Sequence, residues 1–169
     1  MDIVPISQDL AEKFCASFHP YKGCGKVNTY KFGVIECGEL RAVLLFNPPP
    51  PGLALELMPD RPSGVLSFSR MCAVDKNRRG FRLRKVIRHC IKKLIDRNRY
   101  PVIATFADTS FGHDGYIYKI SGFTHDKTTT VMAYHDGYGK RVSVYSAGKR
   151  ARGIVPIGNI TLLRFVHRM

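Results

Sequence analysis

The sequence predicts an α/β or α+β fold, in which helices pack on one central sheet. This prediction rests on an amphipathic helix pattern around residue 90, an apolar strand pattern directly after it, and β-rich segments on both sides. At 169 residues, the chain is expected to form a single domain, residues 1–169, that buries a real core. There is no internal repeat and no break in composition that would mark a domain boundary.

A helix and a hairpin are expected first. Ser7 is a suitable N-cap for "SQDLAEKFCASF", whose apolar residues recur at helical spacing: Leu10, Phe14 and Phe18. Strands Tyr30–Cys37 and Leu40–Asn47 then form a hairpin about a "GE" turn. The prolines at 48–51 exclude a central strand at that point, and "GVLSFSRMCAV" resumes the sheet.

The second half contains the clearest element, a basic amphipathic helix. Its apolar residues form one stripe, and Lys and Arg fill the other faces: Val86, Ile87, Cys90, Ile91, Leu94 and Ile95. "YPVIATFA" follows as an apolar central strand with proline at its start. We then expect a short helix at "YIYKI", antiparallel strands "TTTVMAYHD" and "KRVSVYS" about a "DGYG" turn, and a terminal strand at "NITLLRFVH".

The charge is strongly unbalanced. Lys and Arg number 27 against 13 Asp and Glu, which gives a net charge of +14. Asp96 is the one acid between Lys76 and Arg99, and "GKRARG" adds a second basic run. This imbalance favours a polyanionic partner, which we expect to be double-stranded DNA, over a merely well-solvated basic surface. The phosphate contacts expected in the second run are Lys149, Arg150 and Arg152.

Composition also narrows the compartment. No apolar run approaches the roughly 20 residues of a membrane span, and the N-terminus does not have the pattern of a signal peptide. Five cysteines without close pairing favour reduced thiols in a cytoplasm over a disulfide framework. Cys15, His19 and Cys24 lack the support of a CxxC pair, so no metal site is predicted.

The segment "MCAVDKNRRGFRLRKVIRHCIKKL" joins a strand to the basic helix through a charged turn. Free N–H groups at a helix start, together with flanking arginines, favour an anion. The segment resembles the cofactor turn of the GNAT acyltransferase superfamily, "Gln/Arg-x-x-Gly-x-Gly/Ala", with Asn77, Gly80 and Arg82 at its three positions. Asn77 and Arg82 depart from that pattern, and a plain basic helix is the alternative.

This resemblance implies a particular fold and cofactor site. The fold is a GNAT-like mixed central sheet with splayed parallel strands and helices on both faces. The strand ending near Val74 and the strand Val102–Ala107 would lie side by side and then separate, with a helix starting near Gly80 at the cleft. The implied donor is acetyl-coenzyme A or a related acyl-coenzyme A. Its expected contacts are Cys72, Val74, Asn77, Arg79, Gly80, Phe81 and Arg82.

A second motif strengthens the resemblance. Tyr118, Gly122 and Phe123 match a GNAT pattern "Tyr-x-x-x-Gly-Phe", whose tyrosine protonates the leaving thiolate. The preceding "FADTSFGHDGYIY" is similar to a segment of phage Mom-type DNA-modification proteins, a branch of that superfamily. The matching positions are Ala107, Asp108, Gly112, His113, Gly115, Ile117 and Tyr118. Ser69 beside Arg70, and His19 in "HPYKG", also have counterparts in this branch.

The branch resemblance implies transfer of a carbamoylmethyl group to the exocyclic amine of adenine in DNA, during phage infection or prophage expression. The implied catalytic residues are Asp108, Tyr118, His113, Ser69 and His19. Asp108 at a strand end suits the acceptor of the amine proton, unless it merely caps the next turn. Two other functions remain open: a small-molecule or protein N-acyltransferase, and a non-catalytic DNA-binding anti-restriction protein.

Overall fold

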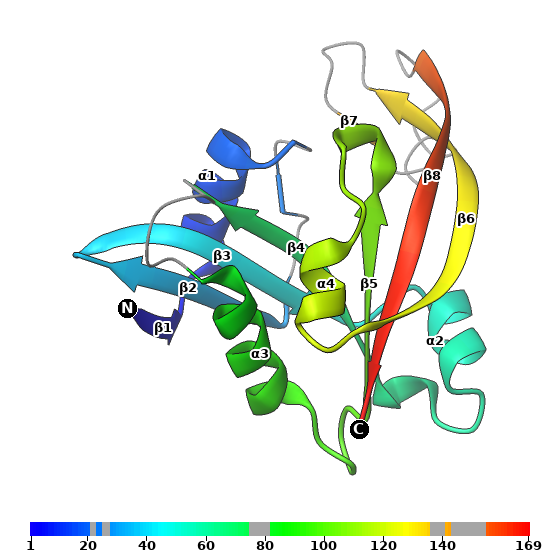
Figure 1. Ribbon diagram of the computed structural model, residues 1–169, viewed down its shortest axis with the longest axis horizontal. Coiled ribbons are helices and arrows are strands. Elements are labelled where there is room, and N and C mark those ends of the chain that lie inside the picture. Colours follow the sequence, from blue (N-terminus) through cyan, green and yellow to red (C-terminus); the bar gives the residue numbers. More distant parts are fainter. Residues whose placement is uncertain (21–22, 25–27, 75–81, 136–140, 143–154) are drawn as a thin grey trace.

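The computed structural model describes residues 1–20, 23–24, 28–74, 82–135, 141–142 and 155–169 (Figure 1). Within these ranges, eight strands form one mixed sheet in the order β1-β2-β3-β4-β5-β8-β6-β7. The expected α/β architecture is therefore confirmed. None of the described helices is long and apolar enough to cross a membrane.

The elements alternate along the chain. The strands are β1 (Asp2–Pro5), β2 (Tyr30–Glu36), β3 (Glu39–Asn47), β4 (Val65–Ala73), β5 (Val102–Asp108), β6 (Thr124–His135), β7 (Arg141–Val142) and β8 (Val155–Arg168). The helices are α1 (Gln8–Phe18), α2 (Pro51–Leu57), α3 (Leu83–Leu94) and α4 (Tyr116–Ile120), with short 3-10 helices η1 (Pro62–Gly64) and η2 (Thr109–Phe111).

Strands β4 and β5 form the one parallel pair among the described strands, and they separate after a short ladder. Pairing runs from Val65 opposite Val102 to Ser67 opposite Ala104 and then ends. Beyond it, β4 continues against β3, while β5 continues antiparallel to β8 as far as Asp108. The predicted pair of splayed parallel strands is confirmed.

A β-bulge at Ser69 changes the direction of the side chains along β4. Arg70 pairs with Leu45 and Phe68 pairs with Phe46, so Ser69 is an extra residue in the ladder. Its hydroxyl donates to the Leu45 carbonyl at 3.2 Å. Because alternation restarts after the bulge, Phe68 packs on the α3 side of the sheet, whereas Cys72 packs on the α1 side.

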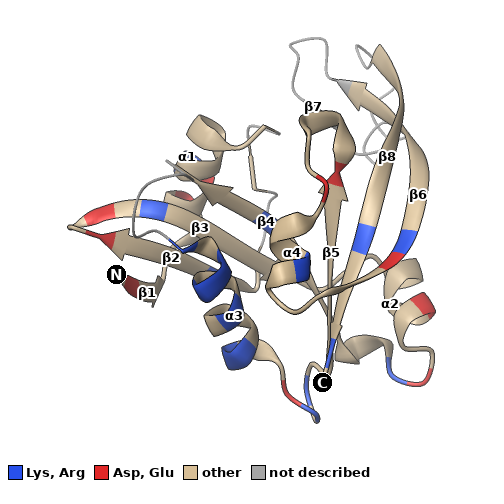
Figure 2. Cartoon of the chain, viewed as in Figure 1, with Lys and Arg blue, Asp and Glu red and all other residues tan. Residues whose placement is uncertain are grey.

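Helices cover both faces of the sheet, as expected. The apolar stripe of α3 is buried with α4 on one face, which confirms the predicted core. Helices α1 and α2 pack on the other face, in two smaller clusters. The opposite side of α3 carries exposed cations (Figure 2): Arg84, Lys85, Arg88, Lys92 and Lys93.

The structure confirms the expected N-cap of helix α1 but shows a different buried stripe. Ser7 does cap α1, since its Oγ accepts from the Leu10 N–H at 3.1 Å. However, the buried stripe of α1 is Ala11, Phe14 and Cys15, and of the residues expected at helical spacing Leu10 and Phe18 are exposed. Helix α1 contacts the sheet through these three buried residues, and Phe18 is the last residue of the helix.

The remaining differences involve prolines and turns. The turn of the β2–β3 hairpin is Cys37–Gly38 rather than "GE", because both residues have the positive φ that a two-residue turn requires. Helix α2 was not predicted: its proline at the first turn excludes a strand but also suits a helix start. Strand β1 was missed as well, and β8 begins at Val155, before the predicted segment.

Candidate active site

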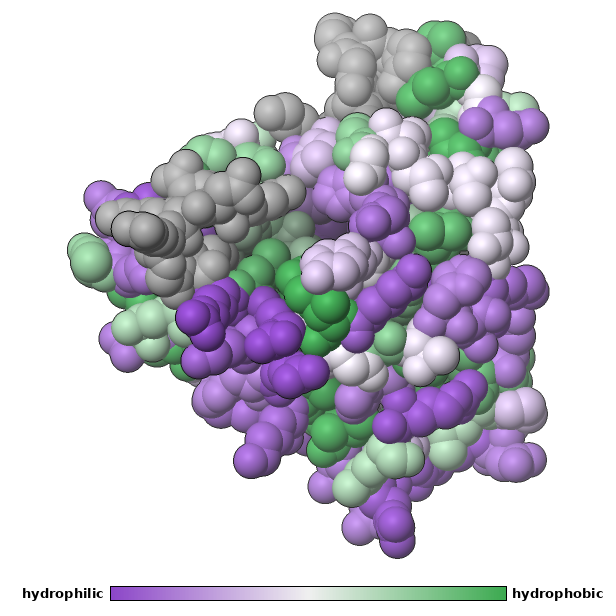
Figure 3. Space-filling model, in the orientation of Figure 1, coloured by the Kyte–Doolittle hydropathy of each residue, from purple (hydrophilic) through white to green (hydrophobic). Residues whose placement is uncertain are grey.

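A cavity of about 540 Å³ lies where β4 and β5 separate. Its walls come from the end of α1, from β4 and β5, from η2 and α4, and from β6 and β8. Figure 3 shows the molecule from the side of α3 and α4, with hydrophilic side chains over α3. The separation of the two strands leaves room for the cavity within the sheet itself.

The cavity brings together residues that are distant in the sequence. All five of the predicted catalytic side chains line it, together with Cys72: His19, Ser69, Asp108, His113 and Tyr118. They come from three separate parts of the chain, the segment after α1, strand β4 and residues 108–118, which the splay collects at one place. Their roles remain predictions, but their proximity is now a structural fact.

The other predicted residues have different positions. Val74 packs against the cluster of α1 and β4, and its N–H donates to the Arg41 carbonyl at 2.9 Å. Arg82 is the N-cap of α3, and its carbonyl accepts from the Lys85 N–H at 2.8 Å. The remaining predicted cofactor and DNA contacts lie outside the described residues: Asn77, Arg79, Gly80, Phe81, Lys149, Arg150 and Arg152.

Asp108 is the last residue of β5 and is only 9% exposed. Its Oδ1 accepts from the Ser110 N–H at 3.0 Å and from the Ser110 hydroxyl at 2.6 Å, so it caps η2. The capping alternative from the sequence is thus observed. These contacts also hold the carboxylate in one orientation at the cavity wall.

Tyr118 lies on α4 and is buried in an aromatic cluster. Its ring centroid is 5.9 Å from that of Phe68 and 5.8 Å from that of Phe123. Burial raises the pKa of Tyr118, against the opposing effects of a hydrogen bond with Thr105 and the charge of Arg70. The phenol therefore keeps its proton at neutral pH.

Thr105 connects the two separating strands. Its Oγ1 donates to the Phe68 carbonyl at 2.9 Å, one step past the last paired residues of β4 and β5. The Thr105 hydroxyl also interacts with the Tyr118 hydroxyl and lowers the pKa of that phenol, against the larger effect of burial. This places the phenol at the apex of the splay.

The cavity reaches both faces of the sheet. Ile103 and Ala107 pack in the core beneath α3 and α4, whereas Ala104 packs in the cluster beneath α2. Alternation along β5 therefore directs Phe106 and Asp108 to the α1–α2 face. Tyr118 approaches from the opposite face, so Asp108 and Tyr118 reach the cavity from opposite sides of the sheet.

Similarity to known proteins is consistent with this geometry. The family model described as "Mom protein family" matches residues 1–153. The chain belongs to the Mom protein family. No curated protein matches it.

Solved structures show the fold of this Mom-family chain. A ribosomal-protein-alanine N-acetyltransferase from Brucella melitensis has a TM-score of 0.62 at 9% identity, with 100% of both chains covered. An IAA acetyltransferase from Bacillus cereus has a TM-score of 0.61 at 11% identity, with 99% of each chain covered. A Bacillus subtilis acetyltransferase in complex with CoA has a TM-score of 0.59 at 12% identity, covering 99% of this chain and 97% of the other. The chain therefore has the GNAT fold.

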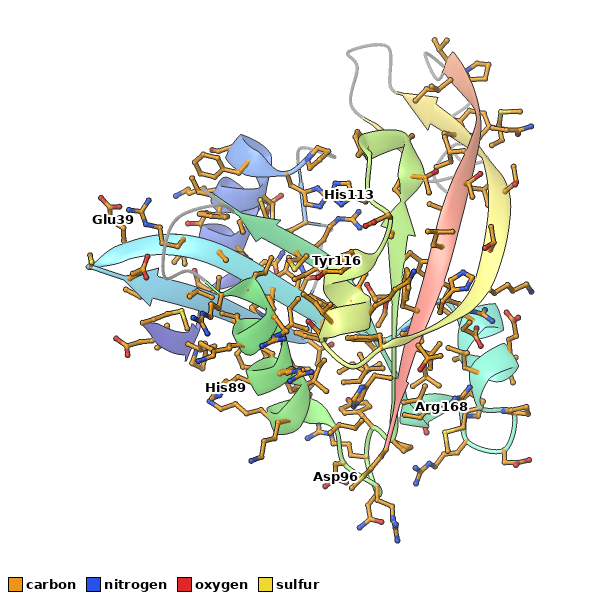
Figure 4. All side chains as sticks on the ribbon, viewed as in Figure 1. Glu39, His89, Asp96, His113, Tyr116 and Arg168 are labelled. Carbon is orange, nitrogen blue, oxygen red and sulfur yellow. The ribbon has the colours of Figure 1, made fainter. Side chains whose placement is uncertain are left out.

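The loop between η2 and α4 is shaped by a close backbone approach. His113 is exposed on this loop, and its ring is 6.4 Å from that of Phe111 (Figure 4). Gly115 has a φ of +75°, and a Cβ at this position would overlap the buried ring of Phe165. Glycine is therefore required at the start of α4, which presents Tyr118 to the cavity.

Some lining residues could not be predicted from the sequence of the Mom-family chain. Arg70 lines the cavity from β4, where its Nη1 donates to the Ser69 carbonyl at 2.8 Å. The bulge decides which face Arg70 joins, and the sequence gives no signal of that register. Thr105 and Phe106 resemble ordinary strand residues, and only the splay places them at the cavity. Within the described part of the chain, no cluster of three or more His, Cys, Asp or Glu residues is arranged to bind a metal.

Proposed function

We propose that this Mom-family protein transfers a small acyl-derived group, of the carbamoylmethyl type, to the exocyclic amine of adenine in double-stranded DNA. The modification would protect phage DNA from restriction enzymes. One observation carries the proposal: a single cavity through the splay holds a carboxylate from one face and a protonated phenol from the other. Family membership supplies the expectation of DNA as substrate.

Asp108 would accept the proton of the attacking amine. The adenine amine is a weak nucleophile because its lone pair is delocalised into the ring, so bond formation needs a proton acceptor close to the nitrogen. The Asp108 carboxylate lines the cavity in the orientation fixed by Ser110. His113 and His19 line the same cavity and would position the base or relay that proton.

Tyr118 would supply the proton that the leaving group requires. Burial keeps its phenol protonated, and its hydrogen bond with Thr105 holds it at the apex of the splay. Its position opposite Asp108 separates proton acceptor from proton donor. Tyr118 can therefore protonate a departing thiolate while Asp108 removes the proton from the amine.

We propose acetyl-coenzyme A or a related acyl-coenzyme A as the donor. In an acyl transfer from such a thioester, the amine attacks the carbonyl carbon, a C–N bond forms, the C–S bond breaks, and coenzyme A leaves as the thiolate that Tyr118 would protonate. A carbamoylmethyl product, which is joined through its methylene carbon, would require a donor that also carries the amide nitrogen. The splay fits its peptide-like arm, because among the described residues β4 has no ladder partner on its β5 side beyond Ser67. Arg82 and the first turn of α3 would approach the phosphates, as N–H groups at a helix start favour anions.

The charge of the chain supports binding to DNA. In a duplex the adenine amine is paired, so the base must leave the stack before it can react. A net charge of +14 provides the phosphate contacts that hold a distorted duplex. We propose that the exposed cations of α3 and the "GKRARG" run provide them without sequence preference. The protein would act in the cytoplasm of a bacterial host.

Restriction protection tests the proposal in cells. Plasmid DNA from cells that express the protein should resist enzymes whose recognition sites contain adenine and remain sensitive to enzymes whose sites contain only G and C. Asp108→Asn should abolish the resistance. Equal sensitivity with the wild-type protein would favour a small-molecule or protein acceptor, or a non-catalytic DNA-binding protein, whereas resistance that persists in Asp108→Asn would remove Asp108 from the catalytic residues.

A further inference from the structure

We propose that Phe106 is the stacking platform for the acceptor, a planar nucleobase with an exocyclic amine. The inference deepens the proposed function and rests on it, because it names the residue that positions the base. Phe106 lines the cavity although 38% of its surface is exposed. An apolar ring left open at a reactive cavity is suited to a flat apolar partner.

The geometry of β5 relates this ring to the carboxylate. Phe106 and Asp108 are two residues apart on one strand, so both side chains leave the same face, with their Cα atoms about 7 Å apart. A base stacked on the Phe106 ring would have one edge near Asp108. An exocyclic amine on that edge can donate a hydrogen bond to the carboxylate, which removal of its proton requires.

Neighbouring residues complete an apolar mouth on this face. Phe18 and Phe111 also line the cavity, and each is more than a third exposed. They lie at the end of α1, which packs on this face, and in η2, which directly follows Asp108. The surroundings thus favour a planar aromatic ring over a flexible aliphatic amine.

A structural role for Phe106 is the alternative. Phe106 pairs with Arg164 across the ladder, and the Arg164 guanidinium is bound by Glu56 at 2.7 Å on the same face. The ring would then only shield this ion pair from water. Such a role predicts a change in melting temperature without any change in base recognition, which separates it from stacking.

The test compares two duplex probes that differ at one nucleotide. In the first, a central adenine faces an abasic site, so that extrusion costs little; in the second, both central positions are abasic. Wild-type protein should bind the adenine probe about 5- to 140-fold more tightly, the range of one base–aromatic stack. Phe106→Ile, which suits a strand, should reduce this ratio towards one, and Phe106→Tyr should retain it.

Tyr116 provides the matched control. It is an aromatic residue of α4 that is 62% exposed and is not among the described residues lining the cavity (Figure 4). Tyr116→Leu should leave the ratio unchanged. A wild-type ratio near one would overturn the proposed function and this inference with it. A wild-type preference that survives in Phe106→Ile would overturn the role of Phe106 alone, with melting temperatures confirming that each variant is folded.

Discussion

At the scale of single residues, Asp108 has an observed capping role and a proposed catalytic role, which one substitution can separate. Its Oδ1 caps η2 through Ser110, and the same carboxylate lines the cavity. Asparagine retains an oxygen that can accept both hydrogen bonds but cannot accept a proton as readily as a carboxylate. The cap and the catalytic role therefore predict different results.

We expect Asp108→Asn to reduce modification by roughly 10²–10⁴-fold, the range for loss of a general base, while folding and DNA affinity are preserved. Turnover per folded molecule and the melting temperature are measured on the same variant. If Asp108 is only a cap, the variant will instead retain its turnover, because asparagine caps about as well as aspartate, while Asp108→Ala will lose about 1 kcal/mol of stability.

Tyr118→Phe should remove the proton donor with little change in packing, because the ring stays in contact with Phe68 and Phe123. Modification should fall by roughly 10²-fold or more. Since burial raises the pKa of Tyr118 above its ordinary value of 10, ionisation of this group should not reduce the wild-type rate between pH 7 and pH 10. A rate that follows ionisation of a tyrosine within this interval, and loses that dependence in Tyr118→Phe, would contradict the assignment.

At the scale of elements, the start of α4 depends on one glycine. Gly115→Ala would place a methyl group against the buried ring of Phe165 and would impose a positive φ on alanine. We expect a loss of about 3 kcal/mol in the free energy of unfolding, measured with urea. Gly112→Ala is the control, because it shares the positive φ but has open space around its Cβ, and should cost about 1 kcal/mol. Equal losses in the two variants would show that contact with Phe165 is unimportant.

An ion-pair cluster attaches α2 to the outer strands. Arg164 binds Glu56 at 2.7 Å and 3.1 Å and also binds Asp126, and the hydrogen bonds from Arg164 and Lys127 lower the pKa of Glu56 from 4.5 to about 2. The folded protein thus binds fewer protons at Glu56 than the unfolded chain does. The resulting stabilisation is complete above pH 4.5 and is lost as the pH falls through about 2.

Glu56→Gln should therefore destabilise the protein most near pH 6, and the difference from wild type should narrow as the pH falls. Urea unfolding of the wild type and the variant at pH 6 and at pH 3 gives the difference in free energy of unfolding at each pH. Because Glu56 is exposed, added salt should also narrow the difference at pH 6. A difference that does not change with pH would show that weaker packing of α2, not the charge, destabilises the variant.

The sequence predicted the elements better than their contacts. The stripe of α3 and the short helix that carries Tyr118 are local patterns, so both were predicted correctly. The exposure of Phe18 and the register at Ser69 depend on how the helix and strands meet, which no local pattern encodes. The same holds for Arg70, Thr105 and Phe106, since only the three-dimensional splay of β4 and β5 makes them part of the cavity.

At the scale of the whole molecule, charge should control affinity for DNA. Reversing Lys149, Arg150 and Arg152 to glutamate should weaken duplex binding and make it less dependent on salt. The slope of the logarithm of the binding constant against the logarithm of the salt concentration should become shallower by about 0.9 for each phosphate that is no longer bound. A second triple reversal on the exposed side of α3 should act similarly: Arg84, Lys85 and Lys92. Lys13 provides a control, because its side chain is exposed on α1: Lys13→Glu should have little effect on duplex binding. Unchanged binding in both triple variants would place the DNA surface elsewhere.

The most direct test of the central claim is mass spectrometry of nucleosides from the DNA of cells that express this protein. The host supplies whatever donor the reaction uses, so the measurement does not depend on identifying it. We predict a deoxyadenosine derivative of higher mass with the wild-type protein, and its loss in Asp108→Asn and Tyr118→Phe. Unmodified deoxyadenosine throughout, from cells that contain folded wild-type protein, would contradict the assignment of DNA adenine as the acceptor.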